Sequence, residues 1–296
     1  MKQRLITSAV GLPLLLAVLY LYDTVIFDVV LLAACLIGFY EAFRAFGLTK
    51  IWGLYVPVCI LTAISFLGNS LKLPGFDSIQ ASCLGSRILM GLFVIVLVVF
   101  TLRNFKRMDI AKLAGALLLC ALLLFCFGTV LWLKALLPFD KYGYLGVFAL
   151  VLSLAYAWGG DAFAYFAGRA FGKRKLCPNI SPNKTVAGAV GSLVGSVVFG
   201  FLFLWLFELT MPLLQPHAVM DIPGWLYAAA AVAGIPAALL GIGGDLFASC
   251  VKRQVGIKDY GSLLPGQGGI LDRFDSAIPV LGFVASCMYA YLLYLA

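Results

Sequence analysis

Charged side chains are scarce in this chain of 296 residues. Asp, Glu, Lys and Arg make up 11% of it, whereas soluble domains carry roughly 25%, and there is a single histidine. Hydrophobic residues reach 63%, and the mean hydropathy is +1.05. So little charge cannot cover a water-soluble fold with polar surface, which excludes the soluble globular class. We predict an all-α, polytopic integral membrane protein.

The eight cysteines lack the spacings that zinc sites and disulfide frameworks require. They stand singly, mostly inside apolar runs, and form neither a CxxC nor a CxH pair. Cysteine behaves as a small hydrophobic residue when it is buried. We therefore expect these side chains to serve in packing.

Nine successive apolar runs have roughly the length of a membrane-spanning helix, about 20 residues. They cover residues 5–22, 25–43, 51–67, 88–102, 113–136, 144–166, 186–206, 225–246 and 278–295. About nine transmembrane helices are therefore predicted, with the N-terminus in the cytoplasm.

The positions of Lys and Arg favour this topology, because such residues concentrate in cytoplasmic loops. Of the 21 Lys and Arg residues, 17 fall on the cytoplasmic side and four fall outside, namely Lys72, Arg87, Lys134 and Lys141. The net charge of +8 thus mainly reflects topology, with anionic lipid and substrate as secondary causes. No nucleic-acid partner is expected.

The two halves of the chain differ in their polar content. Residues 1–140 form hydrophobic spans with short loops and are predicted to be an N-terminal transmembrane scaffold. In this half Glu41 and Arg44 stand three residues apart, a spacing that predicts an interfacial ion pair. Residues 141–296 are predicted to be the C-terminal transmembrane catalytic region of the same continuous membrane domain.

Two long polar segments, 168–184 and 250–276, occur in the second half, and both are cytoplasmic in this topology. Neither is long enough to form a separate soluble domain. A site built from them must lie at the cytoplasmic membrane surface. That location suits a water-soluble anionic substrate that meets a lipid substrate.

The first group of candidate residues precedes and enters segment 168–184. Asp161, Tyr165 and Arg169 are four residues apart, so a helix presents all three on one face. An aspartate that pairs with arginine near a helix end explains this motif equally well. Taken alone, the motif therefore leaves a binding role and a structural role open.

A second group of basic and hydroxyl residues follows it. Lys173 belongs to a Gly-Lys-Arg-Lys run, and Ser181-Pro-Asn-Lys184-Thr185 opens the next predicted helix. Serine or threonine before a helix usually serves as an N-cap. With a lysine alongside, the same helix start also forms a site for phosphate, because its free N–H groups and dipole favour anions.

Three carboxylates mark the second polar segment. Asp245 closes a glycine-rich membrane helix, where an unpaired carboxylate would be costly. Pro265-Gly-Gln267-Gly-Gly269 forms a turn that brings backbone N–H groups close to a ligand. Asp272 and Asp275 then follow three residues apart on one helix face. Carboxylates beside a Lys/Arg loop suit a divalent cation together with phosphate, and the convergence of so many groups disfavours the alternative of ordinary interfacial charge.

Together these residues resemble a known signature. Ser249-x-x-Lys252-Arg253, four residues, Lys258-Asp259, and then Gly268-Gly269-x-x-Asp272-Arg273-x-Asp275 is similar to the signature of the phosphatidate cytidylyltransferases, or CDP-diacylglycerol synthases. Asp161-x-x-Ala164-Tyr165-x-x-Gly168-Arg169-x-x-Gly172-Lys173 and Ser181-Pro182-x-Lys184-Thr185 resemble a second stretch of that family. The likeness covers residues 155–276, and the C-terminal signature is long and specific.

The resemblance implies a nucleotidyltransferase of phospholipid biosynthesis that converts CTP and phosphatidate into CDP-diacylglycerol and pyrophosphate. The implied catalytic residues are Asp245, Asp272, Asp275, Lys252 and Arg253. The three aspartates would also hold Mg²⁺, with a second cation, divalent or K⁺, as an option. The implied substrate-binding residues are Asp161, Tyr165, Arg169, Lys173, Ser181, Lys184, Ser249, Lys258, Gln267 and Arg273.

The same resemblance implies a location and partners. The protein would lie in a bacterial-type inner membrane with its active site facing the cytoplasm, where it meets CTP, phosphatidate and membrane lipid. A homodimer is compatible with the sequence, which fixes neither the oligomeric state, the acyl-chain preference nor the metal.

Two departures keep alternatives open. The family has His where this chain has Gln267, and Glu where it has Ala187. Glutamine takes no proton, but a phosphate monoester is already mostly dianionic at neutral pH, so the reaction does not require a base there. A divergent relative that acts on another lipid phosphate or nucleotide remains an alternative. A non-enzymatic transporter or lipid-binding protein is another, and charges spread along several spans would favour it.

Overall fold

The computed structural model describes residues 2–48, 52–68, 71, 79–104, 109–214, 223–263 and 266–295. Lys72 of the charge count and Pro265 of the glycine-rich turn lie outside these ranges. The chain forms two compact units, Met1–Leu131 with Tyr260–Leu271, and Trp132–Asp259 with Asp272–Ala296. We call them unit 1 and unit 2. The functional division at residue 140 stays a prediction.

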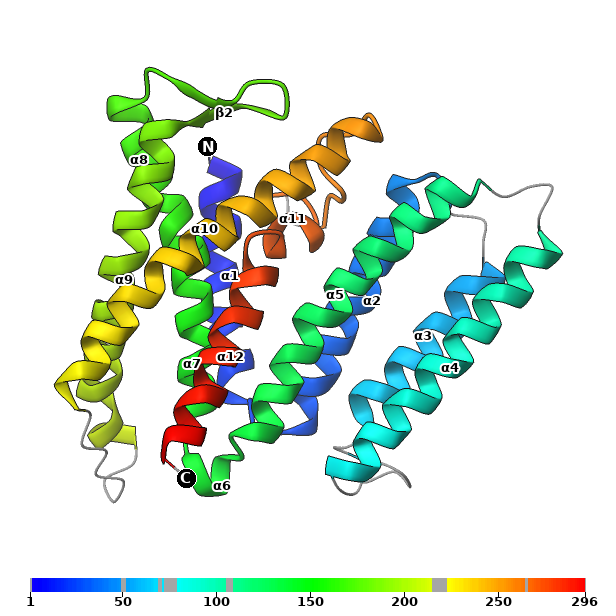
Figure 1. Cartoon of the computed structure of the whole chain (residues 1–296), viewed down its shortest axis with the longest axis horizontal. Helices are drawn as coiled ribbons and strands as arrows, with labels where there is room; N and C mark the ends of the chain where they lie inside the picture. Colours follow the sequence, from blue (N-terminus) through cyan, green and yellow to red (C-terminus); the bar gives the residue numbers. More distant parts are fainter. Residues whose placement is uncertain are drawn as a thin grey trace. The chain divides into compact units, whose positions relative to one another are not determined.

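Unit 1 contains long helices, and their order along the chain follows the apolar runs (Figure 1). They are α1 (Lys2–Tyr20), α2 (Val25–Ala45), α3 (Trp52–Leu67), α4 (Ile79–Arg103) and the larger part of α5 (Ile110–Leu136). Its core includes Phe39 of α2 and Leu123 of α5, both fully buried. A Cβ atom at Gly38 would overlap the Leu123 side chain, so this small residue lets the two helices approach closely.

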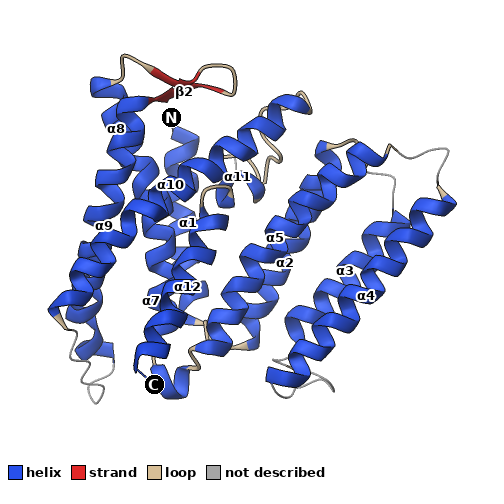
Figure 2. Cartoon of the chain, in the orientation of Figure 1, coloured by secondary structure: helices blue, strands red, loops and turns tan. Residues whose placement is uncertain are grey.

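Unit 2 carries the remaining helices and a two-stranded hairpin. The helices are α6 (Phe139–Tyr142), α7 (Leu145–Leu154), α8 (Gly160–Phe171), α9 (Val186–Leu214), α10 (Gly224–Gln254), α11 (Leu271–Phe274, whose first residue belongs to unit 1) and α12 (Ala277–Leu295). A π-helical turn, η1 (Ala155–Gly159), joins α7 to α8. Strands β1 (Lys175–Cys177) and β2 (Ser181–Thr185) pair antiparallel, with Lys175 opposite Thr185 (Figure 2).

Among the residues that the structure describes, six helical segments are long and apolar enough to cross a membrane, and three further apolar helices are shorter. The six are Val25–Ala45, Ile110–Leu136, Leu145–Phe171, Val186–Thr210, Gly224–Gln254 and Ala277–Tyr294. The shorter ones are Ala9–Tyr20, Gly53–Leu67 and Ile88–Arg103. The prediction of an all-α, polytopic membrane protein is therefore confirmed. The count of nine spans and the side of the N-terminus stay predictions.

Glycines set the helix spacing in unit 2. A Cβ at Gly191 of α9 would meet the backbone of Phe163 in α8, and one at Gly234 of α10 would meet the backbone of Ser196 in α9. A Cβ at Gly244 would collide with the carbonyl of Asp275. Such close backbone contact is typical of membrane helices. They associate by van der Waals packing because lipid removes the hydrophobic driving force, and small residues allow that packing. It brings α10 directly against the segment that precedes α12.

The start of α9 differs from the sequence prediction in one respect. Residues 181–185 form strand β2 and not the opening of the helix. Thr185 is the N-cap, because its Oγ1 accepts a 3.0 Å hydrogen bond from the N–H of Gly188. The sequence thus predicted a Ser or Thr N-cap correctly. The cap is Thr185, whereas Ser181 lies at the other end of strand β2.

Candidate active site

A polar cavity of about 200 Å³ lies within unit 2. Its lining residues come from η1, the first turn of α8, the last turns of α10, and the chain around α11. They are Trp158, Asp161, Asp245, Lys252, Asp259, Asp272, Arg273, Asp275 and Ser276. Five carboxylates and two cationic side chains therefore face one small space.

The helix period of α10 arranges the first of these side chains. Asp245, Ser249 and Lys252 are spaced four and three residues apart, which places them on one face. Ser249 donates a 3.3 Å hydrogen bond from Oγ to Oδ1 of Asp245. This bond fixes the Asp245 carboxylate relative to the helix. Ser249 therefore supports the cavity wall as well as being a candidate ligand.

A buried ion pair joins α10 to α11. Nζ of Lys252 lies 3.0 Å from Oδ1 of Asp272 and 3.8 Å from Oδ2 of Asp275. Breaking such a pair leaves an uncompensated buried charge, which is strongly destabilising. Lys252 thus contacts both aspartates, although α11 ends at Phe274, so Asp275 lies in the turn after it and not on the same helix as the spacing predicted.

The hairpin contributes a further cation, which pairs with one of the lining aspartates. Nζ of Lys184 in β2 lies 2.5 Å from Oδ2 of Asp245, and both side chains are about one quarter exposed, 23% and 25%. This pair links segment 168–184 to the end of α10. The structure thereby brings together the two polar segments that the sequence singled out.

Two further hydrogen bonds tie the cavity walls together. The indole N–H of Trp158 donates to the backbone carbonyl of Arg273 at 3.2 Å. Oγ of Ser276 donates to Oδ2 of Asp161 at 3.3 Å. Both bonds connect the η1–α8 segment to the chain around α11. A π-helical turn such as η1 often occurs at functional sites, because it shifts the helix face that its residues present.

The Arg273 side chain offers a donor to a ligand. Its Nε is buried and has no hydrogen-bond partner within the ranges that the structure describes. A buried N–H group without a partner is costly and rare in a native structure. An anionic oxygen in the cavity would satisfy it.

Asp275 is a weaker acid than usual, mainly because its carboxyl group is buried and then because Asp245 lies nearby. Burial, and then the charge of Asp245, raise the pKa of Asp275 to about 7. The ammonium of Lys252 and the N–H of Ser276, 2.8 Å from Oδ1, act in the opposite direction but do not cancel this effect. Neighbouring carboxylates of this kind favour a bound cation.

Carboxylate oxygens are the ligands that Mg²⁺ prefers, so the donor chemistry of the cavity fits this ion. In the part of the chain that the structure describes, however, no three Asp, Glu, Cys or His side chains already form one ligand group. Lysine ammonium groups lie beside the carboxylates of Asp245, Asp272 and Asp275 instead. The assignment of these aspartates as metal ligands stays a prediction.

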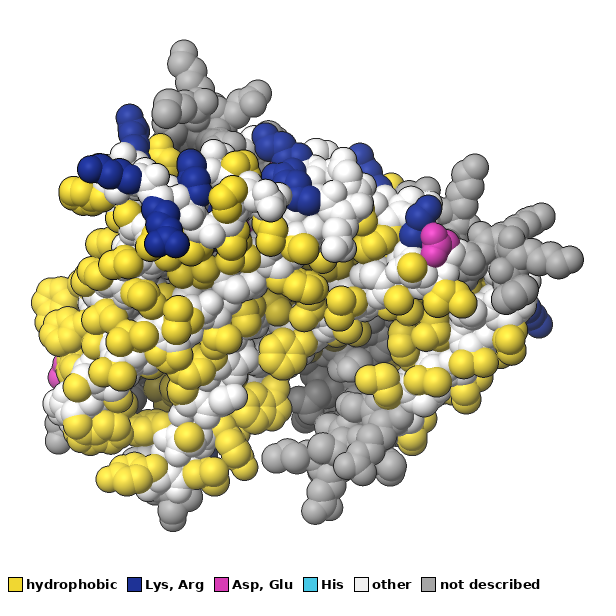
Figure 3. Space-filling model, turned by 45° about the horizontal axis from the view of Figure 1, so that its top comes forward, with side chains coloured by type: hydrophobic (Ala, Val, Ile, Leu, Met, Phe, Trp, Pro, Cys, Tyr) yellow, Lys and Arg dark blue, Asp and Glu magenta, His cyan; other side chains and the backbone are white. Residues whose placement is uncertain are grey.

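Several predicted site residues lie away from the cavity. Tyr165 and Arg169 follow Asp161 along α8 as the spacing predicted, but both are exposed, as are Lys173 and Lys258. Figure 3, in which the hairpin end of unit 2 is turned forward, shows Lys and Arg side chains there above a field of hydrophobic ones. Their substrate-binding roles stay predictions.

Arg253 and Gln267 also stand apart from the cavity lining. The Arg253 guanidinium donates to the carbonyls of Ile180 and Ile257, each at 3.4 Å, and so bridges the hairpin and the end of α10. Gln267 is half-buried in the Tyr260–Leu271 segment of unit 1. Neither residue's predicted role in catalysis or substrate binding is tested by these contacts.

Sequence reasoning did not assign three lining residues, Trp158, Asp259 and Ser276. Asp259 follows Lys258 within the C-terminal signature, and Trp158 begins the Trp-Gly-Gly-Asp run before α8. A tryptophan so close to a cluster of charges was an available signal. Ser276 carried none, because a lone serine at a helix start is ordinary.

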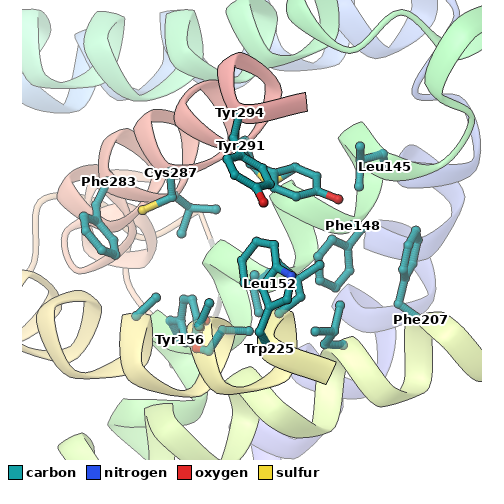
Figure 4. A pocket seen from close by; sticks show the side chains of 17 residues that line it. Leu145, Phe148, Leu152, Tyr156, Phe207, Trp225, Phe283, Cys287, Tyr291 and Tyr294 are labelled. Atoms are coloured by element: carbon teal, nitrogen blue, oxygen red, sulfur yellow. Dashed lines mark hydrogen bonds between the residues drawn. The ribbon is translucent and has the colours of Figure 1, made fainter. Parts of the chain in front are cut away.

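A larger cavity of about 610 Å³ lies in the same unit between α7, α9, α10 and α12 (Figure 4). Its labelled lining includes Phe148, Trp225 and Tyr291. Tyr156, also in the wall, turns its hydroxyl to the carbonyl of Ala230 at 2.5 Å. None of the described residues that line this cavity is charged. It therefore offers space to an apolar group and presents no charged side chain to a phosphate.

Acidic and basic groups in one polar cavity at the ends of membrane helices define a class, membrane enzymes that handle charged phosphate substrates. Residues 2–293 match the Cytidylyltransferase family, and the chain belongs to that family. It is 33% identical to the phosphatidate cytidylyltransferase of Pseudomonas aeruginosa, over 98% of this chain and 97% of the relative. The predicted family is thus confirmed.

Two other relatives bear the same name. The phosphatidate cytidylyltransferase of Haemophilus influenzae is 28% identical over 96% of both chains. That of Bacillus subtilis is 36% identical, but the alignment spans 49% of this chain and 48% of the relative. The protein is therefore a nucleotidyltransferase of the membrane.

Proposed function

We propose that the protein transfers the cytidylyl group of CTP to phosphatidate, which gives CDP-diacylglycerol and pyrophosphate. The observation that carries this proposal is the polar cavity, where Asp245, Lys252, Asp272 and Arg273 meet in one space. Its mixture of acidic and basic groups suits a triphosphate and its cation. The names of the relatives supply the substrates.

In the reaction, a phosphate oxygen of phosphatidate attacks the α-phosphorus of CTP. A new P–O bond forms, the bond from the α-phosphorus to the bridging β-phosphate oxygen breaks, and pyrophosphate leaves with that electron pair. Nothing is oxidised or reduced. The second pKa of a phosphate monoester is near 6, so the nucleophile needs no base at neutral pH. Gln267 in place of histidine is compatible with this chemistry.

The protein contributes positioning and charge, which dominate catalysis of phosphoryl and nucleotidyl transfer. Lys252 and Lys184 are aligned by their aspartate partners and would donate to phosphate oxygens once substrate enters. The Nε of Arg273 would donate there as well. Asp161 and Ser276 would orient substrate at the α8 side of the cavity.

Asp245, Asp272 and Asp275 would hold Mg²⁺, with a second cation, divalent or K⁺, alongside it. Bound there, the ion supplies neutralisation of the triphosphate and activation of the leaving group. The raised pKa of Asp275 supports this assignment, because a carboxylate that is buried and lies near another carboxylate is stabilised by a bound cation.

We further propose that the enzyme lies in the inner membrane with the cavity facing the cytoplasm. The asymmetry of Lys and Arg supports this orientation, as do the bacterial sources of the relatives. A homodimer stays a prediction that the mass of the purified protein in detergent would test.

The experiment is an assay of purified protein with labelled CTP, phosphatidate and Mg²⁺, with an Asp272→Asn variant beside it. We expect labelled CDP-diacylglycerol from the wild type and at least a 100-fold lower rate from the variant. If product forms only with another nucleotide or another lipid phosphate, the proposed substrates are wrong. That result would favour a divergent relative with a different substrate, the alternative that Ala187 and Gln267 leave open.

A further inference from the structure

We propose that Glu41 is a positioning residue of the active site. It holds the Tyr260–Leu271 segment, which we call the 260–271 segment, and thereby fixes the backbone that leads into Asp272. This inference rests on the proposed function, because Asp272 matters only if the cavity is the catalytic site. It assigns an active-site role to the N-terminal half of the chain.

Glu41 lies near the end of α2 and is 4% exposed. Its carboxylate accepts two backbone hydrogen bonds from residues almost 230 positions away in the chain. The N–H of Ile270 donates to Oε1 at 3.1 Å, and the N–H of Leu271 donates to Oε2 at 3.0 Å. The i,i+3 spacing had predicted only Arg44 as a partner of Glu41, whereas the structure shows these two bonds to distant backbone groups.

The two bonds fix successive peptide planes. Because each peptide unit is planar, orienting the N–H groups of Ile270 and Leu271 orients the units on both sides of Ile270. Only the two backbone dihedral angles of Leu271 then separate the held planes from Asp272. The Leu271 side chain is itself buried, at 3% exposure, which limits that remaining freedom.

The 260–271 segment is built to admit the carboxylate. A Cβ atom at Gly261 or at Gly269 would overlap the carboxylate of Glu41. Both positions therefore require glycine as long as a full-length glutamate occupies this place. Two glycines that face one buried carboxylate make the contact specific and not incidental.

Charge and geometry together make Glu41 hard to replace. A carboxylate presents acceptors on both oxygens, whereas an amide presents one acceptor and one donor group. Glu41→Gln therefore keeps the size of the side chain but sets an NH₂ group against one backbone N–H. One of the two amides loses its partner, and the direction in which the chain enters Asp272 is no longer fixed.

The experiment compares full-length Glu41→Gln with Glu208→Gln. Glu208 is the only other glutamate in the sequence, and its exposed carboxylate accepts a hydrogen bond from the Tyr227 hydroxyl. Three properties are measured for each: the folded fraction, the steady-state kinetics per folded molecule with CTP and Mg²⁺ varied, and amide hydrogen exchange in peptides that cover 266–276.

We expect Glu41→Gln to lower kcat by about 10- to 100-fold, because small displacements of catalytic groups cost this much. It should also raise the Mg²⁺ concentration for half-maximal rate and speed exchange at residues 270 and 271. Glu208→Gln should leave all three properties within about twofold of wild type. Wild-type kinetics per folded Glu41→Gln molecule would overturn the proposal, even if less protein folds.

A second pair of variants covers the case in which Glu41→Gln does not fold. Gly269→Ala places a methyl group against the Glu41 carboxylate from the side of the 260–271 segment, and it should lower kcat at least tenfold. Glu41→Asp in the same chain withdraws the carboxylate by one methylene and should restore part of the loss. Absence of any such rescue would contradict the proposal.

The proposed function and the positioning role fail in different ways. A wild-type protein without cytidylyltransferase activity would defeat the function, and with it the role of Glu41 in catalysis. An active wild type with an equally active Glu41→Gln variant would defeat the positioning role alone.

Discussion

Lys252 and Asp272 form an ion pair with 11% and 3% of their side chains exposed, and Nζ of the lysine lies 3.0 Å from Oδ1 of the aspartate. The pair connects the last turn of α10 to α11 inside the polar cavity. It gives Lys252 two roles that can be separated. One is to keep a buried carboxylate compensated, and the other is to donate to substrate.

Lys252→Met should reveal both roles. Removing one partner of a buried pair costs about 3 to 5 kcal/mol of the free energy of unfolding, and activity should fall at least 100-fold. Lys252→Met with Asp272→Asn removes the stranded charge, so stability should recover while activity does not. Thermal unfolding and CDP-diacylglycerol synthesis measure the two effects. If the double variant were no more stable than Lys252→Met, the uncompensated charge of Asp272 would not be what destabilises the single variant.

Lys184→Met tests the contribution of the hairpin. Its ammonium pairs with Asp245, so its loss should lower kcat/KM for CTP by about 10- to 100-fold, the usual cost of a charged contact to phosphate. Lys175→Met is the matched control, because Lys175 lies on the paired strand and is exposed. It should stay within about threefold of wild type. Equal losses in both would indicate a diffuse effect of positive charge.

The helical, membrane-spanning character of the chain could be predicted because it depends on summed hydropathy, which any long apolar run reveals. The helical spacing of Asp161, Tyr165 and Arg169 was likewise visible. The positions of the three side chains relative to the cavity could not be predicted from this spacing. All three residues are exposed, but of the three only Asp161 lines the cavity, because it stands in the first turn of α8, where that helix meets the chain around α11.

Long-range pairing set the other limit of the sequence analysis. The partners of Glu41 lie at 270 and 271, and the partner of Lys184 lies at 245. No local spacing encodes such contacts. A periodic pattern gives the direction of a side chain relative to its own helix, and for Glu41 that was enough to predict only the nearby Arg44. The hairpin at 175–185 is a local contact and was missed for another reason, because its strands have only three and five residues and the longer one contains a proline.

The pKa of Asp275 predicts a pH-dependent requirement for Mg²⁺. Burial, and then the charge of Asp245, raise it to about 7, so the group is increasingly protonated as the pH falls from about 8 to about 6. A metal ligand must be deprotonated, so the Mg²⁺ concentration for half-maximal rate should rise about tenfold per pH unit below 7. Asp275→Asn should weaken Mg²⁺ binding, so that the Mg²⁺ concentration for half-maximal rate is higher at every pH and no longer changes with pH. A half-maximal Mg²⁺ concentration that does not change with pH would contradict the assignment.

Loss of stability does not account for this effect. The folded-state pKa of Asp275 is raised above the ordinary aspartate value of 3.8, so the folded protein binds the extra proton between about pH 4 and pH 7. Its contribution to the free energy of unfolding therefore decreases as the pH rises through this window and increases as the pH falls. Thermal unfolding at each pH provides the control.

Gly244→Ala tests whether close helix contact sets the cavity. A Cβ at this position would collide with the backbone carbonyl of Asp275, which cannot move away as a flexible side chain would. We expect α10 to be displaced from the segment before α12 and activity to fall by about 100-fold, as small shifts of catalytic groups do. Gly243→Ala is the adjacent control, because a Cβ there would meet nothing within 4 Å. Since alanine favours a helix over glycine by about 1 kcal/mol, that control should keep its activity and gain slightly in stability. Equal activity in the two variants would show that Asp245 and Asp275 tolerate a wider separation than this structure gives them.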